Sequence, residues 1–312
     1  MHTTAALILN ELKSRIPSLS DTDHIEQVTK GFSFDAKYFL SKPGSSIPTY
    51  VLRTAPIEQA EKKRHEFELV GRVYELGVAT SKPVSCGKID TLQICYMLLG
   101  YVQGEDASDV LPDLTEDEQY QVGWQAGCEL KRMHELPAPP RLDNWHDRRL
   151  AKHRRQFEAY RQCGVKLPEE EAIVAFIEAN SEAMQGRPDR FQHDDFHPAN
   201  LLVQHRAYSG VIDFNRYDWG DPYHDFLKIA YFSREASIPF CIGQIQGYFD
   251  GEPSEEFWRL YTLYSALIMF GTVTWTLQVI PDHLDSMLER IRTVLSDHRG
   301  LESLIPTWYK PR

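Results

Sequence analysis

The sequence predicts an α+β protein with two lobes: a small N-terminal antiparallel sheet of five strands with one helix, and a larger, mainly helical C-terminal lobe. Two observations predict it. Residues 24–99 carry short extended segments separated by turn residues, with one helical pattern among them. From residue 115 onward, helical periodicity dominates. The chain of 312 residues is long enough for two ordinary domains. We expect them at 1–103 and 104–312, with a hinge at about 97–104.

The composition is that of a soluble globular protein, with 42% hydrophobic and 25% charged residues. The net charge of −11 argues against nucleic acid or an anionic membrane as a partner and fits a neutral or cationic ligand. The five cysteines are scattered without metal-binding spacing, so we expect reduced thiols and a cytoplasmic location. Residues 260–280 contain no charged side chain, but their hydroxyl groups and a glycine favour a buried helix over a membrane span.

The N-terminal elements follow from the residue patterns in order. An amphipathic helix is expected at 2–17, because no basic segment of a signal peptide precedes its apolar run. Alternating and apolar segments bounded by turn residues predict the strands 25–29, 36–40, 47–54, 84–89 and 92–99. A partial apolar face predicts a helix at 57–76, which Gly77 ends. The polar, glycine-bearing segment 100–108 is expected to link the lobes.

The C-terminal lobe begins with a capping box, Thr115 with Glu118, which starts a helix running to about His134. Further helices are expected at 146–162, 168–184, 222–232, 237–249, 254–280 and 281–296. Two short apolar runs, 201–203 and 211–212, predict a strand hairpin joined by a polar turn.

The hairpin is where the chemistry is expected. Asp195 and Asn200 precede its first strand, and Asp213 ends its second, so the three side chains are expected at one edge. Two carboxylates and a carboxamide are the oxygen ligands that Mg²⁺ prefers, and Mg²⁺ commonly accompanies phosphates. The pattern His193-x-Asp195-x₄-Asn200 also has the spacing of a kinase catalytic loop, with Asp213-Phe214 following 13 residues after Asn200.

A second pattern lies upstream. Arg53 occupies the third expected strand, and the following helix carries Glu66 and Glu68. A strand cation paired with a helix carboxylate is a further part of a kinase nucleotide site.

With these motifs the chain resembles the aminoglycoside phosphotransferase and choline kinase-like family, whose fold is that of protein kinases. The residues that carry the resemblance are His193-Asp-Asp-Phe-His197-Pro-Ala-Asn200, Ile212-Asp-Phe-Asn215 and Gly220-Asp221-Pro222 with Asp225. The resemblance implies transfer of the γ-phosphoryl group of ATP or GTP to a hydroxyl group, with Mg²⁺.

The resemblance also implies roles for single residues. Asp195 would be the catalytic base, and Asn200 and Asp213 the Mg²⁺ ligands. Arg53 would contact the nucleotide phosphates, with Glu66 orienting it. The loop 31–35, with Gly31 and Ser33, would cover the phosphates, and the strand end with Met97 and Leu99 would hydrogen-bond the purine.

The sequence departs from the family pattern at four places. Asp194 replaces the usual glycine beside the catalytic loop, and Asn215 replaces the glycine after Asp-Phe. Arg53 stands where lysine is commoner, and the phosphate loop has one glycine. The last two leave the choice between ATP and GTP open.

Other polar residues have two interpretations. Asp194, Asp218, Glu235 and Asp250 are either solvated charges or the lining of a site for a cationic substrate. His193 and His197 are expected to have structural roles, Asp221 and Asp225 are expected to brace the catalytic loop, and Trp275 is expected in the core.

The acceptor is therefore expected to be a small hydroxylated molecule, with no nucleic acid or membrane partner. An aminoglycoside-like antibiotic is the first candidate, and choline, another amino alcohol or a sugar is the alternative. Two further hypotheses, a non-catalytic nucleotide-binding protein and a metal-dependent phosphohydrolase, are less favoured. A histidine–aspartate metal dyad of a hydrolase, here His193-Asp194, is expected on a helix, and Pro198 follows too soon for a stable helix. The oligomeric state stays open.

Overall fold

A computed structural model of the protein describes residues 5–29, 35–140 and 142–312. The chain divides into two compact units, Met1–Gln103 with Ser209–Asn215, and Gly104–Tyr208 with Arg216–Arg312. The segment 209–215 thus corrects the expected boundary, which placed it in the C-terminal lobe. It joins the first unit because the Val211 amide donates to the Ala79 carbonyl at 2.9 Å, and the Thr80 hydroxyl donates to the Val211 carbonyl at 2.7 Å.

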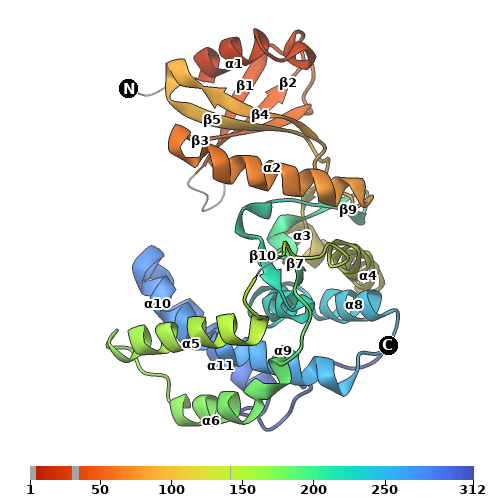
Figure 1. The fold of residues 1–312 in the computed structure, drawn as a ribbon. Helices are drawn as coiled ribbons and strands as arrows, with labels where there is room; N and C mark the ends of the chain where they lie inside the picture. Colours follow the sequence, from red (N-terminus) through yellow and green to blue (C-terminus); the bar gives the residue numbers. More distant parts are fainter. Residues whose placement is uncertain (1–4, 30–34, 141) are drawn as a thin grey trace. The chain divides into compact units, whose positions relative to one another are not determined.

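The first unit contains the predicted antiparallel sheet of five strands, in the order β1-β2-β3-β5-β4. The strands are β1 (His24–Val28), β2 (Ala36–Ser41), β3 (Tyr50–Pro56), β4 (Pro83–Ile89) and β5 (Ile94–Gly100). Two helices belong to this unit, α1 (Ala5–Lys13) and α2 (Ala60–Glu75) (Figure 1). Both predicted helices are therefore present, but each is shorter than the periodicity suggested.

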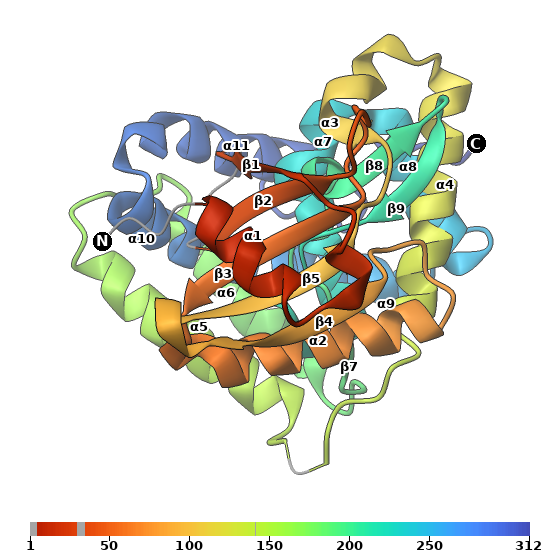
Figure 2. The ribbon, with the colours of Figure 1, turned by 90° about the horizontal axis from the view of Figure 1, so that it is seen from above.

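Side-chain alternation gives the sheet two apolar faces. Leu52 and Leu98 are buried on one face with Ile8 and Leu12 of α1, and Figure 2 shows α1 lying across the strands. Successive side chains of a strand point to opposite faces. Cys95, three residues before Leu98 in β5, therefore lies on the other face and packs with Ala60 of α2. The two helices therefore cover opposite faces of the sheet.

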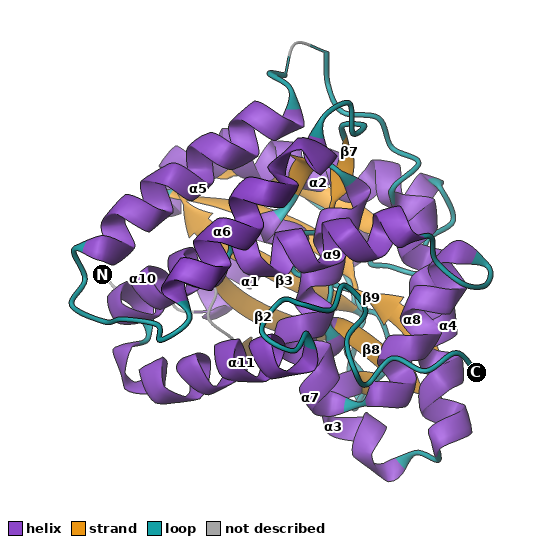
Figure 3. Cartoon of the chain, turned by 90° about the horizontal axis from the view of Figure 1, so that it is seen from below, coloured by secondary structure: helices purple, strands orange, loops and turns teal. Residues whose placement is uncertain are grey.

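The second unit is mainly helical (Figure 3). Its helices are α3 (Ala107–Val110), α4 (Glu116–Met133), α5 (Trp145–Arg161), α6 (Glu170–Asn180), α7 (Arg234–Ala236), α8 (Ile238–Phe249), α9 (Glu255–Leu267), α10 (Met269–Val279) and α11 (Leu284–Asp297). The short strands β6 (Glu105–Asp106), β8 (Leu201–Gln204) and β9 (Ala207–Val211) form one small sheet, although residues 209–211 of β9 are counted with the first unit. Strand β7 (Arg190–Gln192) pairs with β10 (Asp218–Gly220). The capping box is present at the start of α4, where Thr115 and Glu118 exchange hydrogen bonds.

Helices α4 and α8 make unusually close contact through two pairs of glycines, each pair four residues apart. Gly123 and Gly127 of α4 face the backbone of α8, and Gly243 and Gly247 of α8 face the backbone of α4. A Cβ atom at any of these positions would overlap a backbone carbonyl oxygen of the other helix. The absence of side chains here allows the two backbones to touch, an approach at which weak Cα–H···O contacts become available.

Two expectations about helices are corrected. The segment 222–232 is not an α-helix but a 3₁₀ turn, Pro222–Phe226, followed by a π-helical turn, Ile229–Ser233. The Asp221 side chain caps the 3₁₀ turn by accepting from the Tyr223 amide at 3.0 Å. The wider turn that follows is a feature often found near functional sites.

The uncharged segment 260–280 forms α9 and α10, which meet at Ile268 instead of forming one regular helix. By length and composition, Glu255–Val279 could cross a membrane, but 78% of its most apolar window is buried inside the protein. The expectation that Trp275 belongs to the core is wrong. This residue is 36% exposed, and the Arg216 guanidinium lies 5.7 Å from its ring centroid.

Candidate active site

The first unit holds a buried group of ion pairs centred on Arg53 in β3, a side chain that is only 5% exposed. Its guanidinium contacts carboxylates of Asp35 at 2.8 Å, Glu66 at 2.9 Å and Asp213 at 3.2 Å. Burial alone would lower the pKa of Arg53, but these three carboxylates outweigh it and raise that pKa. Of the two helix carboxylates considered from sequence, Glu66 reaches Arg53. Glu68 is on the solvent side and pairs with Arg64.

Sequence reasoning missed two members of this group, Lys63 and Asp35. The buried Lys63 ammonium bonds Glu66 at 2.9 Å and also contacts Asp35. The available signal was the spacing of Lys63 and Glu66, because residues three apart lie on the same face of a helix. The apolar pattern of α2 was only partial because its buried face also carries these charged residues.

The other residues predicted to contact the nucleotide are two pairs, one in the loop 31–35 and one in β5. Gly31 and Ser33 lie outside the described residues. Met97 and Leu99 are buried inside β5, where each is paired on both sides, by β3 and by β4. Their backbone groups are therefore used within the sheet.

The second unit holds the catalytic-loop motif, and Asp225 fixes its shape. The Asp225 carboxylate accepts hydrogen bonds from the backbone amides of His193 at 2.8 Å and Asp194 at 2.7 Å. His134 contacts the same carboxylate at 3.1 Å. Asp194 has φ of +55°, in the left-handed region that aspartate tolerates better than most residues and that glycine adopts freely. This conformation gives a reason for glycine at this position in the pattern.

Asp195 is partly exposed, at 22% of its side chain, and is surrounded by cationic and polar groups. The Lys228 ammonium bonds its Oδ1 at 2.9 Å, and His197 Nε2 lies 3.5 Å from the same oxygen. The Asn200 amide donates to its Oδ2 at 3.2 Å. Burial would raise the pKa of Asp195, but the His197 contact and the Lys228 charge outweigh it and hold that pKa well below its usual range. The carboxylate is therefore ionised at neutral pH.

Asn200 is oriented by its amide nitrogen, which donates to the Asp195 backbone carbonyl at 2.9 Å as well as to the carboxylate. This leaves the carbonyl oxygen at the other end of the carboxamide. That oxygen is the atom with which asparagine binds a hard cation such as Mg²⁺.

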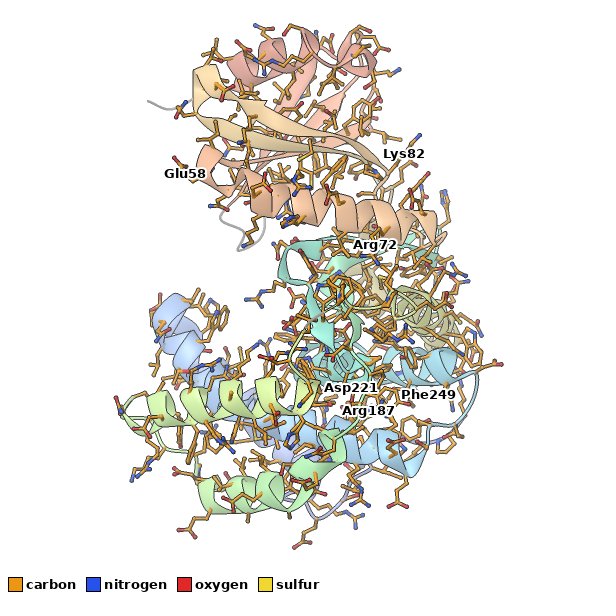
Figure 4. All side chains as sticks on the ribbon, viewed as in Figure 1. Glu58, Arg72, Lys82, Arg187, Asp221 and Phe249 are labelled. Atoms are coloured by element: carbon orange, nitrogen blue, oxygen red, sulfur yellow. The ribbon has the colours of Figure 1, made fainter. Side chains whose placement is uncertain are left out.

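A network around Asp221 supports the loop from behind. Arg187 forms a bidentate ion pair with Asp221 at 2.8 and 3.0 Å, and Figure 4 shows the two side chains next to each other. The Tyr264 hydroxyl donates to the same carboxylate at 2.7 Å, and the Gln192 amide donates to the Asp221 backbone carbonyl at 2.6 Å. As expected from sequence, Asp221 and Asp225 brace the loop.

These two groups of residues carry the motifs of one protein family. The sequence matches the phosphotransferase enzyme family over residues 24–260, which is most of the chain. The protein belongs to this family. It is accordingly a phosphotransferase whose acceptor is a hydroxyl group.

Solved structures agree with this assignment at the level of the fold. The gentamicin complex of APH(2")-IIa superposes with a TM-score of 0.68 at 17% identity, covering 94% of this chain and 97% of that one. The GDP complex of aminoglycoside 2'-phosphotransferase-IIIa gives 0.67 at 14% identity, with coverage of 95% and 100%. A mutant of APH(4)-Ia with ADP and hygromycin B gives 0.65 at 16% identity, with coverage of 91% and 97%. No curated protein matches the sequence. The phosphotransferase therefore has the kinase-like fold that its motifs predicted.

The carboxylates considered for a cationic acceptor are differently placed in the phosphotransferase. Glu235 forms a bidentate ion pair with Arg290 at 2.8 and 2.9 Å. Asp218 accepts from the Trp219 amide at 2.8 Å, and Asp250 is an exposed residue that ends α8 in a left-handed conformation. Asp194 remains beside the catalytic loop, 3.5 Å from His224 Nδ1, and burial raises its pKa to about 6.

The donor chemistry of the phosphotransferase fits a magnesium ion that is held mainly by substrate. Among the described residues, no group of three or more His, Cys, Asp or Glu side chains is arranged to hold a metal ion. Mg²⁺ is commonly held by one or two protein oxygens together with phosphates and waters. Each unit has one oxygen group of this kind, the Asp213 carboxylate in the first and the Asn200 carboxamide in the second.

Proposed function

We propose that this phosphotransferase moves the γ-phosphoryl group of ATP or GTP to a hydroxyl group of a small molecule. The observation that carries the proposal is the ionised Asp195 carboxylate, held by Lys228 and Asn200 in a loop that Asp225 fixes. A carboxylate placed in this way can orient an acceptor hydroxyl and take its proton.

The low pKa of Asp195 makes it a weak base. Phosphoryl transfer passes through a loose transition state, in which little proton transfer is needed before the phosphorus–oxygen bond forms. Asp195 would therefore act first by orienting the hydroxyl and accept the proton late. Lys228 and Asn200 would hold the carboxylate in the required orientation.

On the nucleotide side, Arg53 would contact the phosphates, and Glu66 would fix the direction of its guanidinium. Asn200 and Asp213 would hold Mg²⁺, which neutralises charge on the phosphate oxygens when it is bound. Since Met97 and Leu99 are used within the sheet, we assign purine contacts to the chain that follows Gly100 instead of to these two residues.

Two acceptor classes are supported by different observations. The structural neighbours include complexes with gentamicin and hygromycin B, which supports an aminoglycoside-like acceptor and a role in antibiotic resistance. The surroundings of Asp195 support the alternative, a small hydroxylated metabolite. Asp195 forms ion pairs with two cations, Lys228 and Arg216, which suit an acceptor with an anionic group better than one with ammonium groups.

The test is a coupled assay of nucleotide consumption with Mg²⁺ and either ATP or GTP. The acceptor panel contains aminoglycosides, macrolides, choline, sugars, and hydroxylated acids. Turnover that needs an acceptor, and that disappears in Asp195→Ala while nucleotide binding remains, supports the proposal. Nucleotide hydrolysis without any acceptor would favour a hydrolase. Nucleotide binding without turnover on the whole panel would favour a non-catalytic protein.

A further inference from the structure

The guanidinium of Arg149 in α5 is buried without a partner. The residue is 2% exposed, and none of its three side-chain nitrogens has a hydrogen-bond partner among the described residues. Arginine does not lose its proton in proteins, so this is a buried charge. A buried charge without hydrogen bonds is costly, and such a group in a native protein calls for an explanation, often a ligand or an ion.

A second buried side chain near Arg149, His224, also has ring nitrogens without a hydrogen-bond partner among the described residues. Trp145, one turn earlier on α5, donates to the Tyr264 hydroxyl at 2.8 Å and packs edge-on against His224 at 5.1 Å between ring centroids. His224 is itself 5% exposed, and neither of its ring nitrogens has a hydrogen-bond partner among the described residues. Burial lowers the pKa of His224 well below its usual value, so the ring is neutral and has one N–H to donate.

The carboxylates of this region do not take up the guanidinium hydrogens. Asp194 and Asp218 act on Arg149 electrostatically, but no hydrogen bond joins either of them to it among the described residues. Asp218 instead accepts from a backbone amide, and Asp194 lies beside His224. The donors of Arg149 are therefore available to a further group of opposite charge.

The position of these donors relates them to the candidate base. Asp194, which lies 3.5 Å from His224 and within electrostatic reach of Arg149, directly precedes Asp195 in the chain. Lys152, one turn after Arg149 on α5, is exposed and adds a second cation. A buried cation and an exposed one on the same side of α5 suit a ligand that enters from solvent.

We propose that Arg149 and Lys152 form a subsite for an anionic group of the acceptor, a carboxylate or a phosphate, while the acceptor hydroxyl faces Asp195. The inference rests on the proposed function, and it names an alcohol bearing an acidic group as the acceptor class. The planar guanidinium can bind either group through two parallel hydrogen bonds. His224 supplies a neutral donor to the same group.

The first experiment measures binding without nucleotide. Malonate and inorganic phosphate are titrated against the wild-type protein, Arg149→Met and Arg154→Met, and thermal unfolding is followed. Arg154 is an exposed residue of the same helix and serves as the matched control. We expect at least one anion to raise the unfolding temperature of the wild type and the control but not of Arg149→Met, and the anion that does so separates carboxylate from phosphate chemistry.

Arg149→Met should fold, because it removes a buried charge that has no partner. If it does not fold, Lys152→Met, which changes the exposed member of the subsite, should weaken binding of the same anion at least about threefold, since it removes one of two cations. No shift with either anion in the wild type, or the same shift in Arg149→Met, would overturn the inference.

The second experiment compares matched acceptors: hydroxy acids with their primary amides, and sugar phosphates with the free sugars. We expect kcat/KM to favour the anionic member at least about tenfold, and Arg149→Met to remove the preference mainly through KM. Turnover with no preference for the anionic acceptor would contradict the subsite but would still support the proposed kinase function. Anion binding that depends on Arg149, without turnover of any acceptor, keeps the subsite and overturns the kinase.

Discussion

At the scale of single residues, the most informative side chain is Asp195, because its environment stabilises its charge. A base that is hard to protonate remains ready over the whole physiological pH range, but it gains little from proton transfer. Its value lies in its position. Substitutions that keep its shape and those that disturb its neighbours should therefore have different effects.

Asp195→Asn keeps the size of the side chain and removes the negative charge. We expect kcat to fall at least about 1,000-fold, in line with the loss of a positioned catalytic group, while the affinity for nucleotide stays within a few-fold of wild type. Steady-state kinetics with a responsive acceptor and nucleotide titration check the two parts. A variant that retains a tenth of the wild-type kcat would contradict the assignment of Asp195.

Lys228→Met removes the cation that bonds the Asp195 carboxylate at 2.9 Å. We expect kcat to fall about 10–100-fold, as for the loss of a charged hydrogen bond. Without this cation the pKa of Asp195 moves up toward its usual value, so the acid limb of the pH–rate profile should move to higher pH. A lower kcat with an unchanged acid limb would mean that Lys228 is only structural.

Asp194→Asn tests the carboxyl group whose pKa is raised to about 6. Between the usual pKa near 3.8 and pH 6, the folded protein keeps a proton that the unfolded chain has lost, so stability falls as pH rises through this window. The asparagine variant does not carry this cost. It should therefore be more stable than wild type at pH 7.5 by about 1–2 kcal/mol, the full shift being reduced because 27% of the side chain is exposed.

Urea denaturation of both proteins at pH 4 and pH 7.5 checks this prediction. At pH 4 the carboxyl is protonated in the folded protein and nearly half protonated when unfolded, so the two proteins should differ much less. The charged and titratable groups around Asp194 are the same in both proteins: Arg149, Lys152, Asp218, His224, Asp225 and Lys228. A difference that does not depend on pH would contradict the raised pKa.

The sequence was informative about residues whose spacing is fixed by the reaction. It was less informative about residues that contact the site from distant parts of the chain. The catalytic-loop spacing singled out Asp195 and Asn200, whereas the roles expected for Arg53 and Glu66 came from the family resemblance. Lys63 was missed although its spacing to Glu66 in the same helix offered a signal. Lys228 was missed because a cation that reaches a carboxylate from another element leaves no local pattern. Arg149 was invisible for the same reason, since within α5 it is one of several arginines.

At the scale of elements, the contact of α4 with α8 depends on glycine. Glycine inside a helix ordinarily destabilises it by about 0.5–1 kcal/mol relative to alanine. The four glycines of this contact are retained against that cost because a Cβ at any of them would overlap the opposite backbone.

Gly127→Ala and Gly71→Ala are therefore expected to have opposite effects. A Cβ at Gly127 would overlap the Gln244 carbonyl oxygen, whereas one at Gly71 in α2 would meet only Pro83 Cγ at 3.7 Å. We expect Gly127→Ala to lower the free energy of unfolding by about 1–3 kcal/mol and Gly71→Ala to raise it by about 0.5 kcal/mol. Chemical denaturation of both variants checks the pair. Equal effects would mean that the close contact does not constrain α4.

Elements with strong periodicity were predicted within a few residues, but those shaped by the site were not. The five strands and α2, α4, α5 and α8 lie close to their expected ranges. The expectation of one helix at 222–232 was wrong because the backbone there is set by the hydrogen bonds of Asp221 and Asp225, whose partners are distant in sequence. Trp275 was misplaced because an apolar segment does not reveal which of its faces is buried.

At the scale of the whole molecule, the two units carry different parts of the proposed reaction, with Arg53 in the first and Asp195 in the second. Nucleotide binding should consequently be separable from catalysis. A ligand present at 100 times its Kd stabilises the folded state by about 2.7 kcal/mol. We expect ATP or GTP with Mg²⁺ to raise the unfolding temperature of the wild type and of Asp195→Asn alike.

Arg53→Met should lose most of that nucleotide-induced increase. The comparison uses the ligand-induced change and not the unfolding temperature itself, because the substitution also leaves buried carboxylates with one cation fewer. Thermal unfolding with each nucleotide in turn shows which one the protein prefers. If neither nucleotide shifts the wild type, or if Arg53→Met keeps the full shift, the role of Arg53 is wrong.

The ion-pair group of the first unit has a further consequence that concerns electroneutrality. It contains two cations, Arg53 and Lys63, and three carboxylates, those of Asp35, Glu66 and Asp213, so its formal charge is −1. A divalent cation held at Asp213 changes the sign of this charge to +1. The group then attracts the triphosphate that it would otherwise repel. Metal and nucleotide should consequently each strengthen the binding of the other by the same factor.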